Sequence, residues 1–152
     1  SGSNWRRMAL TGTWPRTLDD KGRLAVPKRV REDLGGTDLK SLFLAPWTEK
    51  SLAVFTPKDF ESLAHRFSEK SAGKANVRNY MRLFYARAEH LDVDSQGRLR
   101  VPDRLKAFAE LKREVVLLGV SDHLELWDAT RWDAYVAQLN PQFDEIAEHA
   151  YE

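Results

Sequence analysis

An internal repeat constrains this chain more than any other feature of its sequence. Residues 19–30 return 75 positions later as residues 94–105, and both copies fit the pattern D-x-x-G-R-L-x-V-P-x-R-[VL]. Chance rarely places six residue types in the same register twice in a short chain. Because a repeat at a fixed spacing indicates a repeated structural unit, the chain is predicted to contain two copies of one module.

The similarity continues beyond this motif at a slightly different spacing. Residues 52–60 resemble residues 124–132 in their apolar and aromatic positions, with an offset of 72 rather than 75. The first copy therefore has three more residues between its two motifs. We place them in the loop of residues 45–51, because surface loops tolerate short insertions.

The repeated motif itself predicts a β-hairpin. Residues 9–18 alternate loosely between apolar and polar, as a strand does, and residues 23–26 resume the alternation. Asp and Gly within residues 19–22 suit a tight turn between the two strands. Arg23 is then expected just past the turn.

Proline, glycine and helix-capping residues predict the elements that follow the hairpin. Thr56 is expected to cap a helix with Pro57 in its first turn, and Asp128 is expected to cap the equivalent helix of the second copy. The predicted elements are helix 28–34, strands 42–44 and 51–55, helix 57–67, a bridging helix 76–90, helix 102–111, a helix through 132–139, and a marginal helix or frayed tail over 142–152.

The polar face of the bridging helix carries several arginines. Arg78, Arg82 and Arg87 either face solvent or contact phosphate.

Length and composition suit one ordinary domain whose two halves share a core. The chain has 152 residues, of which 42% are apolar, and this is enough to bury a real core. We expect the following division: an added leader over 1–8, the first domain over 9–70, a connecting helix over 71–90, the second domain over 91–139 and a C-terminal tail over 140–152.

Several function classes find no support in the sequence. There is no cysteine, and the four histidines do not have metal-ligand spacing. No stretch resembles a membrane span or a signal peptide, and no nucleophile elbow, phosphate-binding loop or dinucleotide-binding pattern is present. We therefore expect a soluble protein that is not an enzyme, with no cofactor, no metal, no membrane partner and no small-molecule substrate.

Charge is distributed unevenly along the chain. Residues 1–75 contain 14 basic and 9 acidic residues, giving +5, whereas residues 76–152 contain 10 and 14, giving −4. Opposite halves could attract head to tail between copies of the chain, closing into a ring or continuing as a fibre. Alternatively, the uneven charge is random variation among solvated surface residues and has no function.

The arginine of the motif points to anion recognition. A turn explains Asp19 and Gly22, but a surface Asp–Arg pair contributes only about 0–1 kcal/mol and does not require arginine. A guanidinium can grip phosphate, or the O6 and N7 edge of guanine, with two hydrogen bonds. Basic residues surround the first motif: Arg16, Lys21, Lys28, Arg29 and Arg31.

The second copy is less basic than the first. Gln96 replaces Lys21 and Asp103 replaces Lys28, although Arg98, Arg100 and Arg104 remain. The second motif is therefore expected to bind phosphate more weakly. From the residues alone, a DNA-binding hairpin and a protein-binding hairpin both stay open.

The ordered set of motifs resembles the MraZ family of bacterial transcription regulators, which contain two SpoVT/AbrB-type swapped-hairpin modules. The resemblance spans about residues 10–139, and residues 17–24, 114–120 and 126–128 are close to the family pattern. Residues 10–15 depart from the family's common F-x-G-x-[YH] opening, which bears on subunit contacts more than on DNA contacts.

The resemblance implies a fold, a function and a site. The implied fold is a β-rich α+β chain in which two tandem swapped-hairpin AbrB-like modules form a pseudo-dimeric β-barrel with flanking helices. The implied protein is cytoplasmic, assembles into a homo-oligomeric ring on the nucleoid, and binds double-stranded DNA at tandem promoter repeats of the division and cell-wall gene cluster, usually as a repressor. The family's D-x-x-x-R motif falls on Asp19 to Arg23 and on Asp94 to Arg98. The motif and the residues around it together give the expected DNA-binding set: Arg23, Arg98, Lys21, Gly22, Asp19, Asp94, Gly97, Gln96, Lys28, Arg29 and Arg104.

An antitoxin-like or scaffold protein is the alternative. In such a protein the same fold serves mainly to bind another protein. Antitoxins of this fold usually carry one module and a long disordered tail, whereas this chain carries two modules and a tail of residues 140–152.

Overall fold

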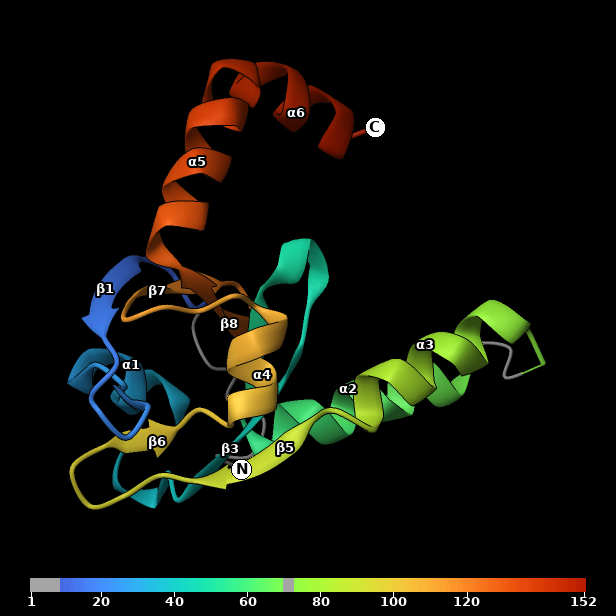
Figure 1. Ribbon diagram of the computed structural model, residues 1–152. Coiled ribbons are helices and arrows are strands. Elements are labelled where there is room, and N and C mark those ends of the chain that lie inside the picture. The colour runs from blue at the N-terminus through green and yellow to red at the C-terminus, as the bar shows by residue number, and fades with distance from the viewer. Residues whose placement is uncertain (1–8, 70–72) are drawn as a thin grey trace.

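The computed structural model describes residues 9–69 and 73–152, so the expected leader at residues 1–8 lies outside the described residues. Pairs of consecutive strands are followed by one or two α-helices along the chain (Figure 1). The strands are β1 (Thr13–Thr17), β2 (Arg23–Ala25), β3 (Ser41–Pro46), β4 (Leu52–Phe55), β5 (Glu89–Asp92), β6 (Arg98–Arg100), β7 (Glu114–Val120) and β8 (His123–Asp128). The α-helices are α1 (Lys28–Leu34), α2 (Pro57–Glu69), α3 (Ala75–Tyr85), α4 (Asp103–Phe108), α5 (Ala129–Leu139) and α6 (Phe143–Ala150), and the 3₁₀ turns are η2 (Gly36–Asp38), η3 (Thr48–Lys50) and η4 (Asn140–Gln142).

The sheet topology repeats the duplication of the sequence. Six antiparallel strands follow the order β1-β7-β8-β4-β3-β5, and β2 pairs with β6 in a separate two-stranded ribbon. The order is the same from either end of the sheet if each strand is replaced by its equivalent in the other copy. The equivalent pairs are β1 and β5, β7 and β3, and β8 and β4. The two copies are therefore related by an approximate two-fold axis within one chain.

The predicted local hairpin is wrong, although its turn is present. Strands β1 and β2 do not pair with each other: β1 pairs with β7, and β2 pairs with β6, so both partners belong to the second copy. Leaving the six-stranded sheet lets β2 and β6 bury Leu24 and Leu99 in the shared core. Burial of such side chains outweighs the local preference for a hairpin, because each contributes about 1.5–3 kcal/mol.

The expected closed barrel is also absent. Within the part of the chain that the structure describes, β1 and β5 are the two edges of an open sheet and do not pair with each other. The β2–β6 ribbon is paired separately, so it does not close the sheet either. The fold is thus an α+β arrangement around a large antiparallel sheet.

One core joins the two copies, as the composition predicted. A single cluster of buried side chains includes Leu24 and Val30 from the first copy and Leu99 and Leu105 from the second. Because neither copy completes this cluster alone, the copies are expected to fold together.

The capping predictions are confirmed. The Asp59 N–H donates to Oγ1 of Thr56 at 3.1 Å at the start of α2, and Oδ2 of Asp128 accepts from the Arg131 N–H at 3.3 Å at the start of α5. The extra residues of the first copy lie where the changed offset placed them. Residues 47–51 separate β3 from β4, whereas only residues 121–122 separate β7 from β8.

Two helices differ from their predicted limits. The bridging helix α3 ends at Tyr85 rather than at residue 90, because residues 89–92 pair with β3 as strand β5. Helix α4 is limited to Asp103–Phe108, shorter than the predicted 102–111. The predicted weak helix near the C-terminus forms as α6.

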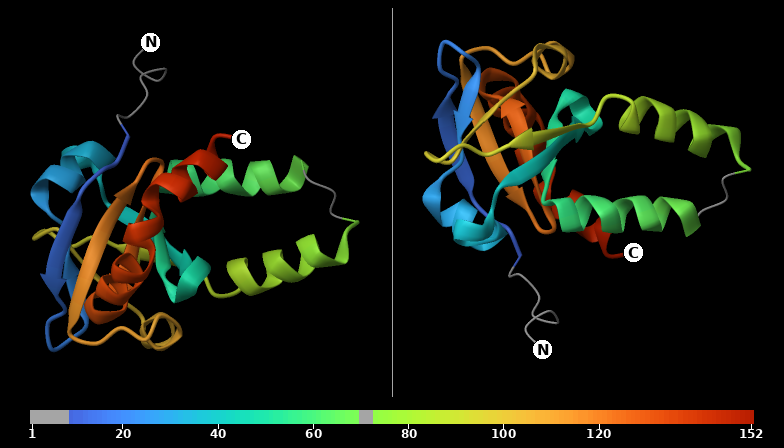
Figure 2. Two further views of the ribbon diagram at one scale, coloured as in Figure 1. Left: turned by 90° about the horizontal axis from the view of Figure 1, so that it is seen from above. Right: turned by 90° about the horizontal axis from the view of Figure 1, so that it is seen from below.

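Two helical projections leave the sheet in different directions. Helices α2 and α3 run side by side away from it, while α5 and α6 extend from β8 on another side (Figures 1 and 2). Phe67 of α2 contacts Tyr80 and Phe84 of α3, with ring centroids 5.4 and 6.4 Å apart. Among the described residues, no helix combines the length and apolar character that a membrane span needs.

Candidate nucleic-acid interface

The first repeated motif forms a turn closed by the aspartate carboxylate. Oδ1 of Asp19 accepts from the N–H groups of Lys21 and Arg23 at 2.9 and 2.8 Å, and Oδ2 accepts from Nε of Arg23 at 2.6 Å. Two backbone hydrogen bonds between Asp19 and residues 22 and 23 complete the turn. The arginine is therefore held at both its backbone and its guanidinium.

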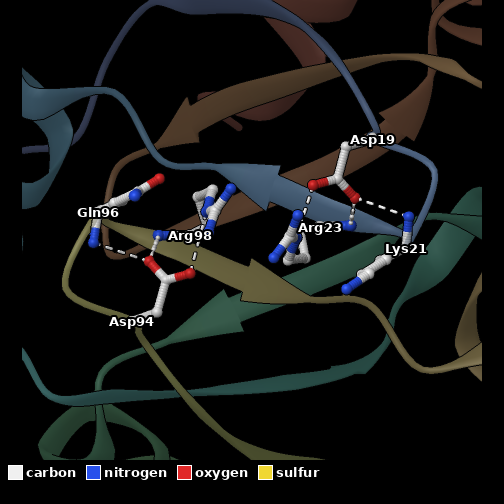
Figure 3. A network of polar contacts seen from close by, with 6 residues as sticks. All are labelled: Asp19, Lys21, Arg23, Asp94, Gln96 and Arg98. Carbon is white, nitrogen blue, oxygen red and sulfur yellow. Dashed lines mark hydrogen bonds and ion pairs between the residues drawn. The ribbon is translucent and has the colours of Figure 1, made fainter.

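The second motif reproduces this network atom for atom. Oδ1 of Asp94 accepts from the N–H groups of Gln96 and Arg98 at 2.9 Å each, and Oδ2 accepts from Nε of Arg98 at 2.9 Å. In Figure 3 the two arginine side chains lie between the two aspartates. The repeated sequence thus encodes a repeated device for orienting arginine.

Each arginine keeps donor capacity for a ligand. Only the Nε–H of each guanidinium is bound to the aspartate, and within the described residues neither Arg23 nor Arg98 forms a hydrogen bond through an Nη atom. Their side chains are 31% and 27% exposed. Two Nη amino groups on a plane held by the aspartate are what two-pronged recognition of guanine or phosphate requires.

The β2–β6 ribbon brings the arginines onto one face. Leu24 pairs with Leu99 and both are buried, so the alternate positions lie on the opposite face. Arg23 pairs with Arg100, and Ala25 pairs with Arg98. Like charges placed directly opposite destabilise a strand pair, so this clustering of Arg23, Arg98 and Arg100 is typical of a face that binds an anion.

Arg100 lies on the same face of the ribbon as Arg23 and Arg98, although it was not among the residues expected to bind DNA. Its repeat equivalent is Ala25, so the extra arginine of the second copy lies opposite the arginine of the first. Comparison of the two repeats could have singled out Arg100, because it is the one position of the ribbon where the first copy has alanine and the second has arginine. Only the strand pairing shows which turn it serves.

Each turn also lies beside a helix residue of the other copy. A Cβ built on Gly22 of the first turn would lie 3.7 Å from Nζ of Lys106, which is in α4. A Cβ on Gly97 of the second turn would lie 2.5 Å from the side chain of Arg31, which is in α1. Arg31 was assigned to the first motif by its position in the sequence, but it lies against the second.

Both glycines are required by the turn. Gly22 and Gly97 have φ values of 75° and 78°, in the region that other residues adopt only at a cost. Both are also buried. They shape the site and add no side chain that could contact DNA.

The remaining predicted residues lie at the margins of the ribbon. Lys28 and Arg29 at the start of α1, and Arg104 in α4, are exposed, and Nη2 of Arg104 lies 3.3 Å from a Glu89 carboxylate oxygen. Arg16 donates to the backbone oxygen of Ala25 at 3.2 Å. None of these contacts holds a side chain as firmly as aspartate holds Arg23.

The turn keeps its aspartates ionised. The Arg23 N–H lowers the pKa of Asp19 to about 2, partial burial opposes this shift, and the guanidinium and the Lys21 N–H add to it. The equivalent hydrogen bonds lower the pKa of Asp94. Both carboxylates are therefore charged at neutral pH, and each can orient its arginine.

A second charged cluster lies in the second copy but outside these turns. Nδ1 of His123 lies 2.7 Å from Asp122, and Nε2 lies 3.2 Å from Glu125. Burial lowers the pKa of His123, but the two carboxylates together outweigh it and raise the pKa. Within the described ranges, no group of three or more His, Cys, Asp or Glu residues is arranged to hold a metal ion.

Comparisons with known proteins agree with the repeat. The family model described as "MraZ protein, putative antitoxin-like" matches residues 9–83 and again residues 84–152. A relative from Leuconostoc mesenteroides, named transcriptional regulator MraZ, is 36% identical over 90% of this chain and 93% of its own length. Relatives of the same name from Moorella thermoacetica and Ligilactobacillus salivarius are 31% and 33% identical, over 90% and 91% of this chain and 93% and 94% of their own lengths. Two family matches in tandem and relatives that align over nearly the whole chain show that the chain belongs to the MraZ family.

Proposed function

We propose that this protein is a sequence-specific DNA-binding transcription regulator in which the β2–β6 ribbon reads DNA. The observation that carries the proposal is the cluster of Arg23, Arg98 and Arg100 on one face, with two of the three guanidiniums oriented by aspartate. Orientation before binding reduces the entropy that an arginine loses on contact. A two-stranded ribbon is also narrow enough to enter the major groove.

The finer features of the proposal follow the family. They comprise a repressor that acts at tandem repeats in the promoter of the division and cell-wall gene cluster, a cytoplasmic and nucleoid-associated location, a homo-oligomeric ring and a swapped-hairpin arrangement of the modules. Pairing of β1 with β7, and of β5 with β3, supports the last of these, since each first strand joins the other copy. Several ribbons on one assembly would bind spaced repeats with much higher avidity than one ribbon.

A gel-shift titration tests this proposal. The purified protein is titrated against the promoter region upstream of the host's division and cell-wall genes, beside scrambled DNA of equal length, at two salt concentrations. We expect selective binding that weakens as salt rises, because phosphate contacts release counterions. Equal binding to both DNAs would leave only a backbone binder.

A protein partner is the competing outcome. The family description includes antitoxin-like proteins, and absence of any gel shift together with a small protein that co-purifies in fixed ratio would favour that function instead.

A further inference from the structure

Exposed large apolar side chains are concentrated on the two helical projections. Of the seven that the described residues contain, Val120 alone lies in the sheet. The others are Tyr80 and Leu83 on α3, Val136 on α5, Phe143 and Ile146 on α6, and Tyr151 just after α6. Contiguous exposed apolar surface marks sites of association.

Helix α6 is largely exposed in the described structure. It spans eight residues and none of them is buried. Phe143, Ile146 and Ala150 follow helical spacing and form an apolar stripe, with Phe143 66% exposed. Because so short a helix is marginal in water by itself, packing of this stripe on another apolar surface would stabilise it.

Helix α3 offers a complementary surface. One side of the helix packs through Phe84, which is buried, whereas Leu83 on the other side is 58% exposed. Residues 73–88 include four basic residues and no acidic residue. The exposed side of α3 is thus a small apolar surface with basic edges.

The segments that contain the two helices, residues 73–88 and 143–152, carry four formal charges each, of opposite sign. Residues 143–152 contain Asp144, Glu145, Glu148 and Glu152, and no Lys or Arg. Within one molecule α3 and α6 lie on different projections and do not run side by side (Figures 1 and 2). Their complementary faces can therefore meet between two molecules.

We infer that α6 of one copy packs on the exposed face of α3 of a second copy, with Phe143 and Ile146 over Leu83 and the acidic edge of α6 along Arg82. This inference rests on the self-assembly proposed above and assigns the surfaces that carry it. The contact joins two different patches, so repetition either closes a ring or extends a filament.

DNA is the other conceivable ligand of the basic face of α3, but two observations favour protein. Leu83 lies among the arginines with more than half of its side chain exposed, and an apolar residue contributes nothing to phosphate binding. The α2–α3 projection also extends away from the β2–β6 ribbon that carries the repeated turns (Figure 1).

Charge reversal in the full-length chain tests this inference. Arg82→Glu and Glu148→Arg each place like charges at the contact, and the two together restore an opposite pair. Lys58→Glu and Glu61→Arg on α2 are matched controls, since both residues are exposed and each repeats one charge change elsewhere. Circular dichroism checks the fold of every variant.

Sedimentation velocity over a concentration series measures assembly, and the gel shift on the same samples measures DNA binding. We expect each single reversal to weaken self-association by about tenfold, the double variant to recover most of the loss, and both controls to assemble like the unaltered protein. Assembly that is unchanged in the single variants, or weakened equally in the controls, would overturn the assigned surfaces.

Two further outcomes separate this inference from the proposed function. If the unaltered protein binds its promoter but stays monomeric throughout the series, the inference fails and the regulator stands. If Arg82→Glu weakens DNA binding while assembly is unchanged, the face of α3 contacts phosphate and not a second copy. Assembly that responds as expected in a protein that binds no promoter DNA would retain the contact and overturn the regulator.

Discussion

The two repeated turns have the same hydrogen bonds but different neighbours. Asp19 and Asp94 each accept from two backbone N–H groups and one arginine Nε. Around them, the first turn has Lys21 and the second has Gln96. The two turns therefore hold the arginine by the same hydrogen bonds. They differ in the charged residues that surround it.

The neighbours also come from unexpected parts of the chain. Arg100 and Lys106 belong to the second copy but lie beside the first turn, and Arg31 belongs to the first copy but lies beside the second. The first turn thus has three basic residues near Arg23, namely Lys21, Arg100 and Lys106. The second turn has fewer basic neighbours, although Arg31 supplies one of them. Charge must therefore be assigned by strand pairing rather than by proximity in sequence.

Separate removal of the two oriented arginines is the strongest test of whether the two turns differ in function. We expect Arg23→Ala to weaken promoter binding by about 1–3 kcal/mol, or roughly 5- to 150-fold, with folding and assembly unchanged. Arg98→Ala should cost less, because its turn has fewer basic neighbours. Gel shifts measure both, with Arg66→Ala on α2 as the control. Equal losses would show that the surrounding charge is irrelevant.

Alanine at the two turn glycines tests the shared backbone. Both positions have positive φ, so each substitution should destabilise the fold by about 1–2 kcal/mol. Gly97→Ala should cost more than Gly22→Ala, since its Cβ would press on the Arg31 side chain. Urea unfolding gives the two values, and adding Arg31→Ala should recover part of the excess. A larger loss at Gly22 would contradict the crossed packing.

Arg100 should affect DNA binding and stability in opposite directions. Arg100→Ala removes the like charge opposite Arg23, so the fold should gain about 0.2–1 kcal/mol. Promoter affinity should fall, and if the residue contacts phosphate the salt dependence should decrease by about 0.9 in log–log slope. The mirror variant Ala25→Arg should show both effects reversed. Loss of stability in Arg100→Ala would mean that its role is structural.

Acid should affect the first turn only over a narrow pH range. Asp19 has a pKa of about 2 in the folded protein against an ordinary value of 3.8. Its lowered pKa stabilises the fold above about pH 4, and this contribution is lost as pH falls through the folded value. Carboxyl NMR titration of the unaltered protein checks the pKa. Titration of Asp19 near 3.8 would show that the turn hydrogen bonds do not form in solution, and Asp19→Asn provides the assignment control.

Much of the local structure could be predicted from the residues. The two D-x-x-G-R turns, the Thr56 and Asp128 caps and the inserted loop at residues 47–51 all occur where they were expected. Each depends on contacts between residues a few positions apart, and such contacts leave a clear trace in the sequence.

The errors came from long-range pairing. Helical spacing continued to residue 90, but residues 89–92 gain more as a strand against β3 than as another helical turn. Residues 23–26 were expected to pair with the adjacent strand, yet β2 pairs with a strand 75 positions away. The closed barrel failed for the same reason, because edge pairing of the sheet is decided by the whole fold.

The sequence by itself determined that this protein has two copies of an aspartate-held arginine, because every hydrogen bond of that device lies within five consecutive residues. Only the tertiary structure decided that Arg23, Arg98 and Arg100 share one face, and that Lys106 and Arg31 lie beside the turn of the other copy. The physical reason is that burial of Leu24 and Leu99 in a common core pairs β2 with β6, and no local pattern records which distant strand a buried leucine will meet.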